Sequence, residues 1–140
     1  QNEPHANSSW EACYMKDEDE IDFLRDHLGP TMVLLHPEIY IFGYDHNRDS
    51  VLQFTERAVA DTQAAQYFQG IAFHWYAAGD HFDVIKKIHE DHPNLILLPS
   101  EATYEKYRFP GGAQQKQVQW NWAFALGYAH DILGDLNGGS

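Results

Sequence analysis

Two glutamates lie where a carboxylate could do chemistry. Glu101 follows the apolar run at 95–98 and the pair Pro99-Ser100, and Glu3 lies in the polar opening stretch QNEPH. Cleavage of a glycosidic bond needs two carboxyl groups, one to protonate the leaving oxygen and one to attack or to activate water. The two glutamates are therefore a candidate catalytic pair, provided that the fold brings them together.

Further polar and aromatic side chains follow the other predicted strands, where parallel α/β folds bind ligands. Aromatic rings pack on the C–H faces of sugars, and amides or histidines bind sugar hydroxyls. These groups are Asp45-His46-Asn47-Arg48 after the first strand and His74-Trp75-Tyr76 at the end of the second.

Each of these residues also has a structural interpretation. Glu101 could be a solvated loop residue or a helix cap, and His74 could be a core histidine bound to a backbone carbonyl. One of Trp75 and Tyr76 is expected to pack in the core, because successive strand side chains point to opposite faces. Arg48 could form only a local ion pair with its neighbouring aspartates, which would contribute little.

A metal site is a further alternative, because carboxylates and imidazoles at strand ends are common ligands. The candidate ligands would be Glu3, Asp45, His46, His74 and Glu101. The sequence contains neither HxH nor HExxH spacing. We therefore predict no metal ligands and no cofactor.

Composition limits the function classes. The chain has 140 residues, 44% of them apolar, which suits one globular unit. Its net charge of −12 opposes binding to nucleic acid or to anionic lipid and suits a neutral partner. No apolar run reaches the roughly 18 residues of a membrane span, and no cationic, apolar leader opens the sequence. The single cysteine, Cys13, cannot form an internal disulfide.

Periodicity predicts alternating helices and strands. Helices are expected where apolar residues recur at helical spacing, and strands where β-branched and aromatic residues cluster. Gly29-Pro30 should end the first helix, a break is expected near Asp61-Thr62, and Pro93 should end the helix before it. The predicted helices are 17–28, 50–69, 82–92 and 117–136, and the predicted strands are 39–44, 70–76 and 95–98.

This order predicts an α/β fold of parallel strands alternating with helices, with about three complete strands and four helices. Such units form either a small doubly wound sheet or part of a (β/α)8 barrel. A complete barrel needs about 200 residues or more, so the chain is too short to close one.

Five ordered blocks of the sequence resemble glycoside hydrolase family 30, in the branch that includes the glucosylceramidases. The resemblance extends over essentially the whole chain. The blocks are QNEP (1–4), LGPT (28–31), DHNRD (45–49), GIAFHWY (70–76) and SEA (100–102).

The resemblance implies a partial (β/α)8 barrel of a retaining β-glycosidase, here a glucosylceramidase-like hydrolase of β-glucosides without a cofactor. It implies that Glu3 is the general acid/base and Glu101 the nucleophile. Six residues would bind substrate: Asn2 at the sugar 2-hydroxyl, Trp10 on the aglycone side, and Asn47, Arg48, His74 and Tyr76 around the catalytic pair.

Compared with the family, the chain corresponds to a fragment, residues 1–140, running from about barrel strands four and five to helix seven. Glu3 then lacks the strand that would anchor it, and the fragment alone is expected to be inactive. The resemblance implies a β-rich side domain in the parent and a secreted, periplasmic or lysosomal location. The alternative is a non-catalytic carbohydrate-binding or structural remnant of such a barrel.

Overall fold

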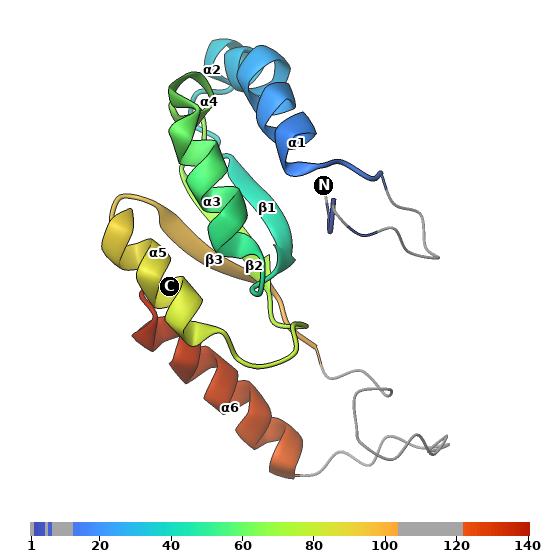
Figure 1. Ribbon diagram of the computed structural model, residues 1–140, viewed down its shortest axis with the longest axis vertical. Helices are drawn as coiled ribbons and strands as arrows, with labels where there is room; N and C mark the ends of the chain where they lie inside the picture. Colours follow the sequence, from blue (N-terminus) through green and yellow to red (C-terminus); the bar gives the residue numbers. More distant parts are fainter. Residues whose placement is uncertain (1, 5, 7–12, 104–121) are drawn as a thin grey trace.

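The computed structural model of this chain describes residues 2–4, 6, 13–103 and 122–140. Its centre is a parallel sheet with the strand order β1-β2-β3 (Figure 1). Helices connect successive strands, which confirms the predicted α/β class. The strands are β1 (Phe42–Asn47), β2 (Gly70–His74) and β3 (Ile96–Glu101). The connecting helices are α3 (Val51–Ala60), α4 (Thr62–Ala65) and α5 (Phe82–Asp91).

The first helix is longer than predicted. Segments α1 (Asp17–Phe23), η1 (Leu24–Leu28) and α2 (Gly29–Leu35) follow one another without a break, so the prediction that Gly29-Pro30 ends the helix is wrong. Segment η1 is π-helical, and the Gly29 N–H donates to the Leu24 carbonyl, five residues back. A proline ring normally clashes with the carbonyl of the preceding helical turn. The wider π turn just before Pro30 accommodates that ring and lets the helix continue.

Strand β1 begins three residues later than predicted. Ile39 and Tyr40 are exposed, and the pairing of β1 with β2 starts at Phe42 opposite Gly70. The prediction from local apolar residues therefore begins the strand too early, because the strand begins where its pairing with β2 begins. As a consequence, Asp45 and its two successors belong to the strand itself and not to the loop that follows it.

The other predicted elements are confirmed with small changes at their ends. The Asp61 carboxylate accepts hydrogen bonds from two backbone N–H groups and starts α4, as the predicted break requires. Helix α5 ends at Asp91, before Pro93. Strand β2 stops at His74, whereas β3 continues to Glu101. Helix α6 (Trp122–Asn137) confirms the last predicted helix over its described part.

The core lies between the sheet and helices α3 and α5. Ile71 and Phe73 of β2 belong to a buried apolar cluster with Phe54 of α3 and Ile85 of α5. Because strand side chains alternate, Ala72 and His74 point to the opposite face of the sheet. The candidate polar residues of β2 are therefore separated from the apolar core by the sheet.

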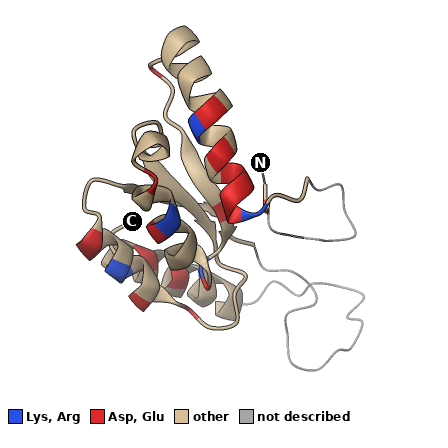
Figure 2. Ribbon diagram, turned by 45° about the horizontal axis from the view of Figure 1, so that its top comes forward, with Lys and Arg blue, Asp and Glu red and all other residues tan. Residues whose placement is uncertain are grey.

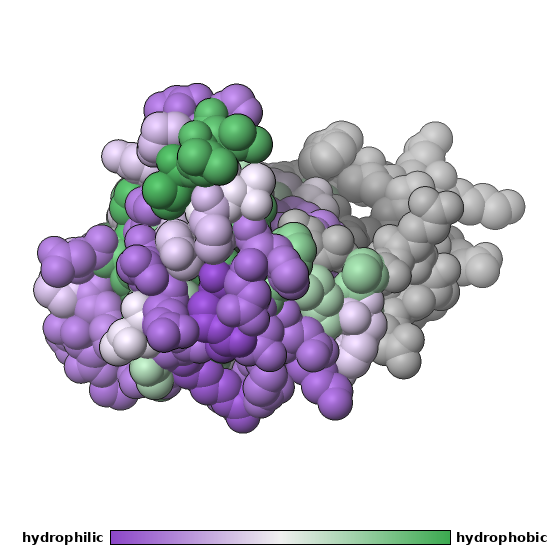
Figure 3. Space-filling view, turned by 90° about the horizontal axis from the view of Figure 1, so that it is seen from above, coloured by the Kyte–Doolittle hydropathy of each residue, from purple (hydrophilic) through white to green (hydrophobic). Residues whose placement is uncertain are grey.

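Charged and apolar surfaces are segregated. Acidic residues are concentrated on the helices, notably α1 and α5 (Figure 2). An apolar patch lies at the end of the molecule that carries α2 (Figure 3), where Val33, Leu34 and Leu35 are exposed. Within the described ranges, no helix combines the length and apolar character that crossing a membrane would require.

We expect Gly29→Ala to destabilise the protein. A Cβ at this position would lie 2.2 Å from the Tyr67 ring, so one of the two must move. In an open helix the same change would stabilise by roughly 1 kcal/mol, but overpacking should instead cost about 1–3 kcal/mol. Urea unfolding of the purified protein measures the difference. Val33→Ala, at an exposed position of the same helix, is the control, and a Gly29→Ala variant as stable as this control would contradict the packing argument.

Candidate active site

The centre of the site is the imidazole of His74, at the carboxyl end of the middle strand. Only 1% of its side chain is exposed. Nδ1 lies 3.2 Å from Glu3 Oε1, and Nε2 lies 3.2 Å from Asp45 Oδ1 and 3.8 Å from Glu101 Oε2. The two glutamates singled out in the sequence therefore approach one ring, Glu3 at one nitrogen and Glu101 at the other.

Irregularities in the two outer strands shape this site. Pairing with β2 skips Asp45 in β1 and Ser100 in β3, so each strand carries one extra residue. Tyr44 and Asp45 have φ angles of 81° and 50°, in the left-handed region that costs non-glycine residues roughly 1–3 kcal/mol. The Ser100 hydroxyl donates to Asp45 Oδ1 at 2.7 Å, across the end of β2. The bulges thus place Asp45 and Ser100 together beside His74.

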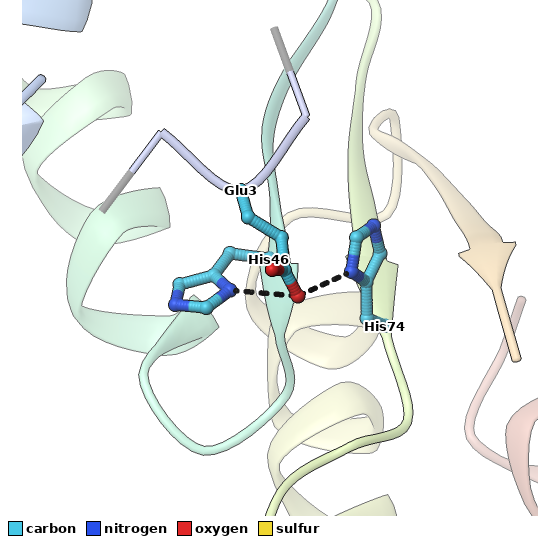
Figure 4. Close-up of side chains that lie close together, drawn as sticks. All are labelled: Glu3, His46 and His74. Atoms are coloured by element: carbon cyan, nitrogen blue, oxygen red, sulfur yellow. Dashed lines mark hydrogen bonds and ion pairs between the residues drawn. The ribbon is translucent and has the colours of Figure 1, made fainter. Parts of the chain in front are cut away.

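The backbone of the same bulge anchors Glu3. The Glu3 N–H donates to the Asp45 carbonyl at 2.9 Å, and Pro4, the next residue, is buried. This hydrogen bond ties the backbone of Glu3 to strand β1, in place of the barrel strand that would lead into it in the family. The Glu3 carboxylate lies between the rings of His46 and His74, with Oε1 3.6 Å from His46 Nδ1 (Figure 4).

Glu101 is held from the other side. The Tyr76 hydroxyl donates to Glu101 Oε1 at 2.9 Å, and the Trp75 N–H donates to the Glu101 carbonyl at 3.3 Å. Asn47 Oδ1 accepts the Tyr76 backbone N–H at 3.1 Å. The structure therefore brings Asn47, His74 and Tyr76 together around Glu101, whose side chain is 45% exposed.

Arg48 lies elsewhere, and its predicted contact with substrate is wrong. Its guanidinium is buried, packs over the Phe82 ring at 4.8 Å, and donates to Asp131 at 2.6 Å and to Asp135 at 2.5 Å, both on α6. The predicted ion pair of Arg48 with its neighbouring aspartates is also wrong, because the observed partners are Asp131 and Asp135. The Arg48 N–H donates to the His74 carbonyl, continuing the strand pairing, so its side chain points away from that of Asn47.

Two predicted substrate-binding residues remain, Asn2 and Trp10. Asn2 is exposed beside Glu3. Trp10 lies outside the described residues.

Burial and hydrogen bonding act in opposite directions on the central pair. Burial alone would lower the pKa of His74, but hydrogen bonds to Asp45 and Glu3 and the nearby carboxylates raise it above its ordinary value. Burial alone would raise the pKa of Asp45, but its bonds from His74 and Ser100 lower it. Asp45 is therefore an ionised acceptor that favours a proton on His74.

The predicted catalytic and substrate-binding residues do not include Asp45, His46 or Ser100, which the structure places in the site. The sequence offers Asp45 and His46 as polar residues after the first strand, but the early predicted end of that strand assigns them to a loop. A polar residue directly after an apolar strand was the available signal. What the sequence did not reveal is the pair of bulges that joins Asp45 to Ser100. Glu3, His46 and His74 are the described residues whose arrangement could hold a metal ion.

Residues 1–139 match the model of the glycosyl hydrolase family 30 TIM-barrel domain. The chain belongs to this family. That match confirms the resemblance carried by the five sequence blocks, and it identifies the three parallel strands as part of a (β/α)8 barrel.

Individual relatives agree with the family match. The chain is 30% identical over 123 residues to putative glucosylceramidase 1 of Caenorhabditis elegans, covering 86% of this chain and 23% of that protein. The crystal structure of SrfJ from Salmonella typhimurium superimposes with a TM-score of 0.81 at 32% identity, covering 99% of this chain and 29% of the other. The endo-β1,6-glucanase BT3312 gives a TM-score of 0.63 at 30% identity, covering 70% and 22%. The chain thus spans less than a third of these relatives.

We expect the buried Asp135 to make stability depend on pH. Burial raises its pKa from 3.8 to about 6, although Arg48 opposes the shift. The folded state therefore binds this proton more tightly than the unfolded state. The resulting stabilisation is complete below about pH 4 and is lost as the pH rises through 6.

Asp135→Asn, which imitates the protonated form, should remove this dependence. Between pH 4 and pH 7 the free energy of unfolding of the wild type should fall relative to that of the variant by about 1–3 kcal/mol. Denaturant unfolding across this range gives both curves, with Asp83→Asn on exposed α5 surface as the control. Parallel curves for the wild type and Asp135→Asn would show that Asp135 is not the titrating group.

Proposed function

We propose that the protein that carries this chain is a retaining β-glycosidase of glucosylceramidase type, with Glu101 as nucleophile and Glu3 as general acid/base. The observation that carries the proposal is the approach of both carboxylates to one buried imidazole at the carboxyl ends of parallel strands. Membership of glycosyl hydrolase family 30 supports the same reaction class.

In the first step, a Glu101 oxygen attacks the anomeric carbon while the bond from that carbon to the leaving oxygen breaks. Protonated Glu3 gives its proton to the leaving oxygen, and a glycosyl ester on Glu101 results. In the second step, Glu3 takes a proton from water, the water oxygen attacks the anomeric carbon, and Glu101 is released as carboxylate. Two inversions give net retention. This mechanism requires the two carboxyl groups to be about 5–5.5 Å apart.

The surroundings of the two glutamates suit their different roles. Tyr76 donates to one oxygen of Glu101, which fixes the carboxylate and leaves its half-exposed side accessible. Glu3 is more buried, with 12% of its side chain exposed. Esterification of Glu101 in the first step removes its charge, and Glu3 then acts as the base toward water in the second step.

Around this pair, Asn2, Asn47, His74 and Tyr76 are the proposed contacts to the sugar, with Trp10 on the aglycone side. A neutral β-glucoside suits a chain whose net charge is −12. The named relatives include a glucosylceramidase and an endo-β1,6-glucanase, so a glucosyl lipid and a β-1,6-glucan are the two substrates to compare. We expect the glucosyl lipid to be preferred, because five blocks of the sequence resemble the glucosylceramidase branch.

The 140 residues alone should turn over little or no substrate, since they span less than a third of the matched relatives. If the whole protein binds β-glucosides but does not hydrolyse an aryl β-glucoside, it is a carbohydrate-binding member of the family and the catalytic proposal fails.

We expect Glu101→Gln in the whole protein to abolish hydrolysis and covalent labelling by a mechanism-based glycosidase inhibitor, because the amide cannot form the glycosyl ester. Mass spectrometry of the inhibitor-treated protein locates the label. Glu38→Gln, at an exposed glutamate before the opposite end of β1, is the control and should be labelled like the wild type. A label that persists in the Glu101→Gln protein would assign the nucleophile to another residue.

Glu3→Gln should show a different pattern. Loss of a general acid lowers the rate by roughly 10²–10⁴-fold. The loss of kcat/KM should be large for an alkyl glucoside and much smaller for a dinitrophenyl glucoside, whose leaving group needs no proton. Equal losses for both substrates would argue against the acid/base role.

A further inference from the structure

We propose that Glu3, His46 and His74 form a binding site for a divalent transition-metal ion of the zinc type. One oxygen of Glu3 and one ring nitrogen of each histidine lie within 4.8 Å of one another. Oε1 of Glu3 is 3.2 Å from His74 Nδ1 and 3.6 Å from His46 Nδ1, and Figure 4 shows the carboxylate between the two rings.

These separations match the size of a zinc coordination sphere. Ligand atoms about 2.0–2.1 Å from a tetrahedral zinc ion are roughly 3.3 Å apart. Two of the three atom pairs are already within a few tenths of an ångström of that value. Two imidazoles and one carboxylate are a ligand set that zinc accepts, with a fourth position left for water or another small ligand.

The hydrogen bonding of His74 favours the same assignment. Its Nε2 faces Asp45 Oδ1, and Asp45 in turn accepts a hydrogen bond from Ser100. An ionised carboxylate can only accept, so a proton of His74 lies on Nε2. A metal ion that binds between His74 and Glu3 would replace the proton that Nδ1 shares with Glu3 and use the lone pair of Nδ1. A histidine ligand that donates its other N–H to a carboxylate is the usual arrangement in metal sites.

The three ligands are also fixed by the fold. His46 and His74 lie on paired strands, and Glu3 is bonded through its backbone to the Asp45 carbonyl. A site on regular elements changes little when an ion binds. The net charge of −12 raises the local concentration of cations around the protein.

Binding would have a consequence for activity that rests on the proposed function. A metal ion bound to the Glu3 carboxylate would compete with the catalytic proton for that group. Zinc should therefore inhibit glycoside hydrolysis reversibly, and a chelator should restore it.

Titration of the metal-free whole protein with Zn²⁺ tests the binding site directly, and the visible spectrum of the Co²⁺-loaded protein reports tetrahedral imidazole coordination. We expect one site per chain that His46→Gln weakens at least 10-fold. Asp45→Asn should weaken it by about 10–100-fold, because it removes the carboxylate that orients His74. His36→Gln, at an exposed histidine on another part of the chain, is the control and should leave the affinity unchanged.

Zinc affinity that is the same in His46→Gln and Asp45→Asn as in the wild type would overturn the proposal, and so would loss of the site in the control. Circular dichroism of each variant confirms that it is folded. Binding that depends on His46 but leaves hydrolysis uninhibited would keep the metal site and would count against the catalytic role of Glu3, so the two proposals fail separately.

Discussion

The site depends on one buried imidazole whose two nitrogens face carboxylates. His74 is 1% exposed, and a ring so deeply buried is stable there only if both nitrogens have polar partners. Glu3 supplies one partner and Asp45 the other, and both belong to segments outside β2. Satisfying this ring therefore fixes the first residues of the chain and the end of β1 relative to β2, and the hydrogen bond from Ser100 to Asp45 adds the end of β3.

This arrangement strains the backbone of β1. Tyr44 and Asp45 adopt left-handed conformations that non-glycine residues normally avoid. The distortion turns the Asp45 carboxylate toward His74 and Ser100 while its carbonyl accepts the Glu3 N–H. Strain of this kind is concentrated where several interactions hold one geometry. The bulge serves both the side-chain site and the anchoring of Glu3.

A second buried charge cluster supports the same strand ends from the opposite side of the backbone. Arg48 links the residue after β1 to Asp131 and Asp135 of α6, and its guanidinium packs on Phe82 of α5. Burial raises the pKa of Asp135, and the charge of the neighbouring Asp131 adds to the increase, although Arg48 opposes both effects. The cluster ties α6 to the residue after β1 and to Phe82 of α5, so Arg48, although adjacent in sequence to the site, contributes to its support and not to substrate contact.

The sequence by itself determined the α/β alternation, because apolar periodicity and the signals at Asp61 and Pro93 act within a few residues of chain. It also determined the family, since blocks such as QNEP and SEA are local strings. It singled out His74 and Glu101 by their position at the ends of apolar strands, and Glu3 by the QNEP block. The tertiary structure alone decided where β1 begins and how it pairs, which carboxylates form ion pairs with Arg48, and that Ser100 donates a hydrogen bond to Asp45. Those features depend on pairing between segments distant in the chain, where hydrogen bonding and packing across the sheet outweigh local preference.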